Sequence, residues 1–289
     1  GWHRGAVPLP AALNRAVIKP RAYSDAPEER LPAAMMFDLT GKVALVTGTG
    51  RGVGRGIAAA LAAQGATVVL NDRDPDSLAE TAELIRPLGS AVFMAAFDVS
   101  DRPAVEAGIA TAEQQAGPID ILVNNAGKGG QHGIGRKPFR DSGPADWDGP
   151  LSVDYYGVLH CTRAVVNGMC HRGWGRIVNI SSDTGTTGVG VAKGGGFSAY
   201  AAAKGAAVSL MRHVAVETAA DGVTANSIAL GLMTAPVADD ERMAMAAGIP
   251  VGRMGTPADV GALCAYLVSD EASWITGQTI HLTGGHVTT

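Results

Sequence analysis

The sequence predicts an α/β fold: one open, doubly wound parallel sheet with helices on both faces. From Gly41 onward, short strand-like runs alternate with longer alanine-rich segments of helical length. This rhythm is typical of right-handed strand–helix–strand crossovers. Several of the short runs are apolar at every position, as strands covered by helices on both faces should be.

The predicted strands and helices follow one another without an internal linker. The strands are Val43–Thr47, Thr67–Asn71, Ala91–Phe97, Ile119–Asn124, Gly175–Ser181 and Thr224–Ile228. The helices are Val53–Gln64, Asp76–Leu88, Pro103–Ala116, Asp146–Cys170 and Ala199–Ala220. Residues 36–289 are therefore expected to form one domain, with its ligands at the carboxyl ends of the strands.

Residues 1–35 differ in composition from the rest of the chain. They contain five prolines, scattered arginines and no sustained apolar period. One interpretation is a mitochondrial transit peptide, because residues 1–24 hold four basic residues and no acid. We favour an irregular N-terminal arm or leader ahead of a start at Met35 or Met36.

Composition and charge limit the kinds of partner that the protein is expected to bind. The 289 residues carry a formal net charge of −4 without a long basic run, so neither nucleic acid nor a membrane is expected as a partner. No apolar run reaches the roughly 18 residues that span a bilayer. Cys161, Cys170 and Cys264 form no metal-ligand cluster, and no metal is expected. We expect all three cysteines to be buried, and the protein to be cytoplasmic.

A glycine-rich turn lies between the first strand and the first helix. It reads Thr47-Gly48-Thr49-Gly50-Arg51-Gly52-Val53-Gly54. Glycines at such a place let backbone N–H groups approach a pyrophosphate at the helix N-terminus. The strand before it and the helix after it favour a Rossmann-type nucleotide site over an ordinary tight turn.

Polar residues follow the next three strands at the same edge of the sheet. Asp72 lies about twenty residues after the turn, where a carboxylate can accept hydrogen bonds from the adenosine ribose. The alternative role for Asp72 is a helix cap, which Asp74 and Asp76 would fill better. The third strand ends in Asp98-Val99 and the fourth in Asn124-Asn125-Ala126-Gly127.

Tyr200 and Lys204 are four residues apart, so on a helix they share one face. A nearby ammonium, together with the positively charged nicotinamide ring, favours the phenolate and is expected to lower the pKa of Tyr200 toward the working range. The phenolate can take a proton from an alcohol, and the phenol can return one. Ser182 can hydrogen-bond the substrate oxygen. An isolated Tyr/Lys pair would indicate an ordinary helix surface, but Ser182 and the glycine turn favour catalysis.

Five motifs in this order resemble the short-chain dehydrogenase/reductase (SDR) family. They are the TGxxxGxG turn, Asp98-Val99, Asn124–Gly127, the YxxxK segment Tyr200–Lys204 preceded by Asn179–Ser182, and the tail Trp274–His281 with Gly284-Gly285. The resemblance implies hydride transfer between NAD(P) and a secondary alcohol or ketone. It makes Tyr200 the general acid/base and Ser182 the residue that orients the substrate. It makes Lys204 the residue that adjusts the pKa of Tyr200 and contacts the ribose of the cofactor.

Three positions depart from the family's pattern. Asp154 stands where the catalytic tetrad usually has asparagine; it either supports the same proton relay, which we favour, or is a helix residue beside an altered relay. The glycine-rich interval Gly185–Gly196, with Lys193, is longer than usual and either shapes specificity or is a flexible insertion. Leu230 replaces the usual proline before Gly231.

The resemblance also implies a set of cofactor contacts. They are Gly48, Gly50, Arg51, Gly52, Val53, Gly54, Asp72, Arg73, Asp98, Val99, Asn125, Ala126, Gly127, Tyr200, Lys204, Gly231, Met233 and Thr234. Asp72 would repel the extra phosphate of NADP, whereas Arg51 and Arg73 would pair with it. The sequence is compatible with NAD or NADP as the cofactor. We favour NAD because Asp72 would have to move before an arginine could bind the extra phosphate of NADP.

The substrate is expected to be a small-molecule alcohol or ketone. Asp154–Cys161 and Gly173–Arg176 resemble reductases of 3-hydroxyacyl thioesters and cyclic hydroxyacyl-CoA compounds, and sugar-acid and steroid dehydrogenases share much of this pattern. The loops expected to line the pocket are Lys128–Trp147, Gly185–Phe197 and Pro236–Gly248.

The resemblance further implies a homotetramer built on the two longest predicted helices and the C-terminal strand. Two alternatives to a dehydrogenase remain. A nucleotide-binding regulatory protein would be expected to have lost Tyr200 or Lys204, and a lyase or dehalogenase would be expected to have a disrupted glycine turn.

Overall fold

The computed structural model describes residues 36–128, 137–188, 196–234 and 238–288. Met35–Thr289 form one compact unit. The expected N-terminal arm, residues 1–35, lies outside the described residues.

Within the described part of the chain, seven strands form one parallel sheet in the order β3-β2-β1-β4-β5-β6-β7. The strands are β1 (Val43–Thr47), β2 (Thr67–Asp72), β3 (Val92–Ala96), β4 (Ile121–Asn124), β5 (Gly175–Ser182), β6 (Val223–Leu230) and β7 (Thr279–Leu282). All six predicted strands are confirmed, and β7 lies in the tail that resembles the family's last strand. The strand order reverses between β1 and β4, where doubly wound sheets bind their ligands.

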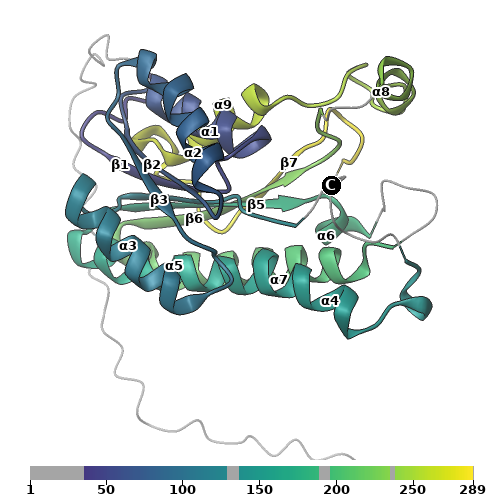
Figure 1. Cartoon of the computed structure of the whole chain (residues 1–289), viewed down its shortest axis with the longest axis horizontal. Helices are drawn as coiled ribbons and strands as arrows, with labels where there is room; N and C mark the ends of the chain where they lie inside the picture. Colours follow the sequence, from purple (N-terminus) through teal and green to yellow (C-terminus); the bar gives the residue numbers. More distant parts are fainter. Residues whose placement is uncertain (1–35, 129–136, 189–195, 235–237, 289) are drawn as a thin grey trace, which may run out of the picture. The chain divides into compact units, whose positions relative to one another are not determined.

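Helices cover both faces of the sheet (Figure 1). They are α1 (Gly52–Ala63), α2 (Pro75–Ile85), α3 (Arg102–Ala116), α4 (Pro144–Pro150), α5 (Gly157–Arg172), α6 (Thr184–Thr187), α7 (Ser198–Thr218), α8 (Asp239–Ala246) and α9 (Pro257–Val268). Helices α1, α2 and α9 lie on one face, and α3, α5 and α7 on the other.

Each face of the sheet has its own hydrophobic core, because successive strand residues point to opposite faces. Val46 packs with Leu61 of α1 and Leu267 of α9 in one cluster. Leu45, the neighbour of Val46, belongs to the other cluster, with Met211 of α7. The strands are therefore buried on both sides, as their continuous apolar runs predict.

The predicted helix over Asp146–Cys170 is confirmed as one continuous helical stretch, but its hydrogen-bond pattern changes along the way. Helix α4 ends at Pro150, Leu151–Tyr156 form a π-helical segment, and α5 starts at Gly157. Proline has no backbone N–H to donate to the preceding turn, which explains the change of hydrogen-bond pattern at this point. The π-helical segment contains Asp154, which is fully buried.

The three cysteines form no disulfide. Cys161 and Cys264 are buried, but Cys170 is only half-buried, so the prediction that all three are buried is wrong for Cys170. It lies in the last turn of α5, close to Asp221, where the helix meets solvent. Among the described helices, none is long and apolar enough to cross a membrane.

Candidate active site

The glycine turn between β1 and α1 is tightly folded. Gly48 has a φ of +69°, and a Cβ on it would lie 2.8 Å from Ala126 Cα. A Cβ on Gly54 would lie 2.1 Å from the carbonyl oxygen of Gly48. Helix α1 starts at Gly52 without a side-chain cap from Arg51, which leaves backbone N–H groups of its first turn available to an anion. The turn therefore fits the pyrophosphate of a dinucleotide.

Thr47 ties the turn to the end of β4. Its Oγ1 accepts hydrogen bonds of 3.0 Å from the backbone N–H groups of both Asn125 and Ala126. Asn125 Nδ2 donates to the carbonyl oxygens of Thr47 (2.8 Å) and Gly48 (3.0 Å). The structure thus brings Asn125 and Ala126 against the glycine turn, as predicted. No role for Thr47 is predicted from the sequence; the signal is a hydroxyl at the end of an apolar strand.

The carboxylates of Asp72, the last residue of β2, and of Asp98, after β3, lie at the same edge. Asp72 Oδ2 accepts a 3.0 Å hydrogen bond from Gly50 N. Burial raises the pKa of Asp98, but hydrogen bonds from Ser100 and the charges of Arg73 and Lys128 outweigh burial and leave that pKa lowered. Asp98 is therefore ionised at neutral pH.

Other predicted cofactor contacts occupy the expected strand ends. Val99 is buried, and its carbonyl oxygen lies 3.0 Å from His160 Nδ1. After β6, Gly231 N donates to Leu282 O at 3.1 Å, and Thr234 N donates to Gly255 O at 2.8 Å. Met233, between them, pairs with Gly255 in an isolated bridge. Arg51 and Arg73 are exposed, whereas Val53 packs against the core.

The structure brings together the three predicted catalytic residues. Ser182 ends β5, while Tyr200 and Lys204 lie one turn apart on α7. Tyr200 forms a hydrogen bond with Ser182. Lys204 Nζ lies 5.8 Å from the centroid of the Tyr200 ring and donates a 2.8 Å hydrogen bond to Ile180 O. These contacts join β5 to α7 at the carboxyl edge of the sheet.

Asp154 belongs to the same cluster. Its Oδ1 lies 3.2 Å from Lys204 Nζ, and the two side chains are 0% and 5% exposed. Its Oδ2 accepts a 3.1 Å hydrogen bond from Lys128 N. A Cβ on Gly127 would lie 2.5 Å from Asp154 Oδ1, so only glycine leaves room for this ion pair.

The residues of this chain alone raise the pKa of Tyr200, whereas the expected lowering counted the nicotinamide ring as well as Lys204. Burial raises the pKa of Tyr200, Lys204 lowers it, and Asp154 raises it again, with a net increase. Burial lowers the pKa of Lys204, but the Asp154 carboxylate and Tyr200 more than offset this, so the pKa is raised. The expectation placed Asp154 in the tetrad but did not include the burial of Tyr200 or the field of the Asp154 carboxylate.

Asp183, directly after Ser182, is a further residue that the sequence reasoning missed. It is buried, and its Oδ1 accepts a 3.3 Å hydrogen bond from Ser182 Oγ. His286 Nδ1 lies 3.8 Å from its other carboxylate oxygen. Burial is the main cause of the raised pKa of Asp183. The available signal was an acid at the carboxyl end of a strand.

The predicted substrate loops are described only in part. Residues 129–136, 189–195 (with Lys193) and 235–237 lie outside the described residues. A small cleft beside the catalytic cluster is lined by Lys137, Ser142, Asp146, Trp147, Gly196, Ser198, Ala199 and Tyr200. Parts of the first two predicted loops therefore do meet at Tyr200.

A protein-family model described as Enoyl-(Acyl carrier protein) reductase matches residues 48–287. The 3-oxoacyl-[acyl-carrier-protein] reductase FabG of Vibrio harveyi is 36% identical over 252 residues, which cover 86% of this chain and 98% of that protein. This chain belongs to the short-chain dehydrogenase/reductase family.

Two further proteins match this chain over a similar share of its length. Nodulation protein G of Rhizobium sp. (strain N33) is 40% identical over 254 residues, 86% of this chain and 98% of that protein. The gluconate 5-dehydrogenase of Burkholderia cenocepacia J2315, solved in complex with NADP and tartrate, has a TM-score of 0.78 at 34% identity, covering 86% of this chain and 96% of that one. The present SDR is accordingly an NAD(P)-dependent oxidoreductase that interconverts hydroxyl and keto groups.

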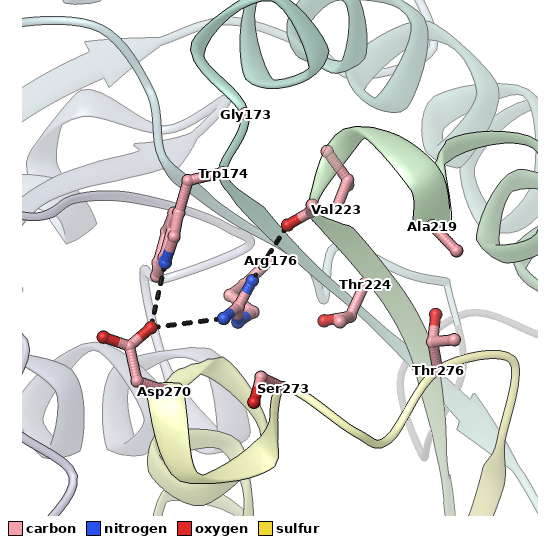
Figure 2. Close-up of a pocket in the computed structure, with 10 residues that line it drawn as sticks. Gly173, Trp174, Arg176, Ala219, Val223, Thr224, Asp270, Ser273 and Thr276 are labelled. Atoms are coloured by element: carbon pink, nitrogen blue, oxygen red, sulfur yellow. Dashed lines mark hydrogen bonds and ion pairs between the residues drawn. The ribbon is translucent and has the colours of Figure 1, made fainter. Parts of the chain in front are cut away.

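A pocket of about 350 Å³ lies at the amino ends of β5 and β6, whereas the catalytic cluster lies at the carboxyl ends of the strands (Figure 2). There Trp174 Nε1 and Arg176 Nη2 converge on Asp270 Oδ1, at 2.9 and 3.2 Å. Arg176 is 3% exposed and also donates to the carbonyl oxygens of Gly175, Gly222 and Ser269. These hydrogen bonds use the guanidinium donors of Arg176 and connect the amino ends of β5 and β6. We therefore assign this pocket a structural role.

Proposed function

We propose that Tyr200, Lys204 and Ser182 perform the acid–base step of hydride transfer between NAD(P) and a ketone or secondary alcohol. The observation that carries this proposal is the contact of Ser182 and Lys204 with Tyr200 at the carboxyl edge of the sheet. The glycine turn follows β1 at the same edge, and supports a cofactor site next to this cluster.

When bound, the nicotinamide supplies the hydride for reduction and accepts it in oxidation. In reduction, the Tyr200 hydroxyl donates its proton to the substrate oxygen, on which negative charge develops. Ser182 Oγ–H donates a hydrogen bond to the same oxygen and orients it. The Lys204 ammonium stabilises the phenolate that remains. In alcohol oxidation, the phenolate removes the proton instead.

We further propose that the cofactor lies along the predicted contacts and that NAD is preferred. Gly48, Gly50 and Gly54 would hold the pyrophosphate, and Asp72 the adenosine ribose. The hydrogen bond from Gly50 N fixes the Asp72 carboxylate against the turn, where it would repel a ribose phosphate. The gluconate 5-dehydrogenase of Burkholderia cenocepacia J2315 was solved with NADP. The NAD preference that we propose for this chain therefore differs from the cofactor found in that structure.

For the substrate, we propose a 3-oxoacyl thioester or a keto sugar acid. The relatives named for 3-oxoacyl-[acyl-carrier-protein] and gluconate chemistry support these two classes. The cleft beside Tyr200 offers Trp147 for apolar contact and Lys137, which pairs with Asp146 at 2.9 Å.

The test is an absorbance assay of NADH and NADPH oxidation with 3-oxoacyl thioesters, keto sugar acids, cyclic acyl-CoA ketones and steroid ketones. Turnover with at least one class supports the proposal. Saturable binding of cofactor without turnover of any ketone, or of the matching alcohols with NAD(P), would favour the regulatory alternative.

The homotetramer also remains a proposal. Val216 of α7 is 82% exposed and Trp274, just before β7, is 97% exposed. Large apolar side chains at both predicted interfaces support association through them. Three cysteines without a disulfide support a reducing, cytoplasmic location.

A further inference from the structure

Asp154 and Lys204 form a buried ion pair beside the proposed proton donor. The pair joins the π-helical segment before α5 to α7, with 3.2 Å between Asp154 Oδ1 and Lys204 Nζ. Both side chains are at least nine-tenths buried, so water screens their charges weakly. The pattern of the family usually has an uncharged asparagine at this position, and Asp154 places a negative charge there.

Three charged groups from the described residues act on Tyr200. They are Lys204 on its own helix, Asp154 from the π-helical segment, and Asp183 from the end of β5. His286 and His281 in turn face Asp183. Among the described residues that act on Tyr200 by charge, Lys204 favours the phenolate, whereas both carboxylates favour the protonated phenol.

Two opposite charges 3.2 Å apart act at a distance as a dipole, not as a single cation. Lys204 is 5.8 Å from the centre of the Tyr200 ring, which is farther than it is from its counter-ion. The attraction that the ammonium exerts on a phenolate is therefore reduced by the carboxylate behind it.

We infer that Asp154 is a positioning residue that holds Lys204 as its counter-ion and weakens the field of Lys204 at Tyr200, so that the phenol stays protonated and able to support ketone reduction up to a higher pH. This inference rests on the proposed role of Tyr200. Reduction requires the protonated phenol: its O–H bond breaks, a new O–H bond forms on the substrate oxygen, and the phenolate regains a proton from solvent. A phenol that keeps its proton to higher pH stays competent for this step over a wider range.

The decisive variant is Asp154→Asn, which removes the charge but keeps the shape. The pH dependence of kcat/KM would be measured in both directions. We expect the high-pH fall in reduction and the rise in oxidation to move together to lower pH, by about one pH unit. A purely structural role would lower the plateaus without moving these midpoints. Asp148→Asn makes the same charge change at an exposed position of α4 and should move neither.

A second measurement does not depend on turnover. The ultraviolet absorbance of tyrosinate would be titrated for the full-length protein, and the curve of Tyr200→Phe subtracted. The difference curve reports Tyr200 alone. We expect its midpoint in the otherwise unchanged protein at or above the reference value of roughly 10. In the Asp154→Asn background, with its own Tyr200→Phe partner, the midpoint should be lower.

The turnover assay tests the catalytic role of Tyr200, and the titration tests the effect of Asp154 on it. Absence of turnover with every substrate would overturn the proposed function and leave the titration readable. An unmoved titration midpoint in folded Asp154→Asn would overturn the inference even if the enzyme is active. If Asp154→Asn does not fold, a midpoint well below the reference value in the unchanged protein would overturn it instead.

Discussion

Gly50 N donates a 3.0 Å hydrogen bond to Asp72 Oδ2 and so joins the glycine turn to the end of β2. A Cβ on Gly50 would lie 2.9 Å from this carboxylate oxygen and 2.4 Å from Ser77 Oγ. The close approach fixes one carboxylate oxygen at the proposed ribose position. The neighbouring Arg51 and Arg73 are exposed and carry the charge that a ribose phosphate would need.

Replacing Asp72 by serine should shift cofactor preference from NADH toward NADPH. Two like charges 4 Å apart cost roughly 4 kcal/mol at an effective dielectric of 20, before screening and rearrangement. We therefore expect the ratio of kcat/KM values to change by about ten- to a hundredfold, with a parallel change in the Kd values of the two cofactors.

Asp76→Ser is the matched control for this charge change, because Asp76 is an exposed acid of the first turn of α2. It should leave the ratio within about twofold. A preference of the unchanged enzyme for NADPH of tenfold or more would contradict the proposed role of Asp72.

The strands are predicted well from the sequence because burial on both faces gives each of them a nearly continuous run of apolar residues. Val43–Thr47 is apolar up to its last residue and is found as β1 with the same bounds. Helix α9 was not predicted, although Thr256, Pro257 and Asp259 form a recognisable start signal. Its apolar residues are nearly continuous, so it shows little helical periodicity.

The candidate site is predictable where local spacing determines it. Tyr200 and Lys204 are one helical turn apart, and their shared face follows from that spacing alone. The pairing of Lys204 with Asp154 spans 50 residues and depends on how α7 packs against the π-helical segment. The direction of the Tyr200 pKa shift depends on this packing, so local spacing could not give it.

Asp259→Asn should destabilise the fold at the start of α9. Asp259 accepts hydrogen bonds from Thr256 N and Oγ1, both at 2.7 Å, and from both terminal nitrogens of Arg253 at 2.8 Å. Loss of such a cap costs about 1 kcal/mol. Urea unfolding at neutral pH would measure the change in the free energy of unfolding.

The destabilisation should depend on pH in a defined direction. The hydrogen bond from Arg253, with those from Thr256, holds the pKa of Asp259 below its ordinary value of 3.8. A depressed folded-state pKa means that the stabilisation is complete above the unfolded-state pKa and is lost as the pH falls through the folded-state value. The difference between Asp259→Asn and the unchanged protein should therefore shrink below about pH 4. A difference that grows on acidification would contradict this assignment.

Trp274→Arg and Val216→Arg should each weaken the proposed tetramer. Each places a charge on an exposed apolar site at one of the two expected interfaces, and the double variant should be a monomer. Light scattering at micromolar concentration measures the mass. Leu84→Arg, a comparable change at an exposed site on α2, should leave the mass unchanged. A monomeric unchanged protein at this concentration would contradict the assembly proposal.

The most direct measurement of the central claim is turnover by Tyr200→Phe. This change removes one hydroxyl, and the ion pair between Lys204 and Asp154 does not involve it. General acid–base catalysis is worth about 10²–10⁴-fold, so we expect kcat to fall by at least a hundredfold while the Kd of the cofactor changes little. A Tyr200→Phe enzyme with turnover within about threefold of the unchanged enzyme, far less than acid–base catalysis contributes, would contradict the assignment of Tyr200 as the proton donor.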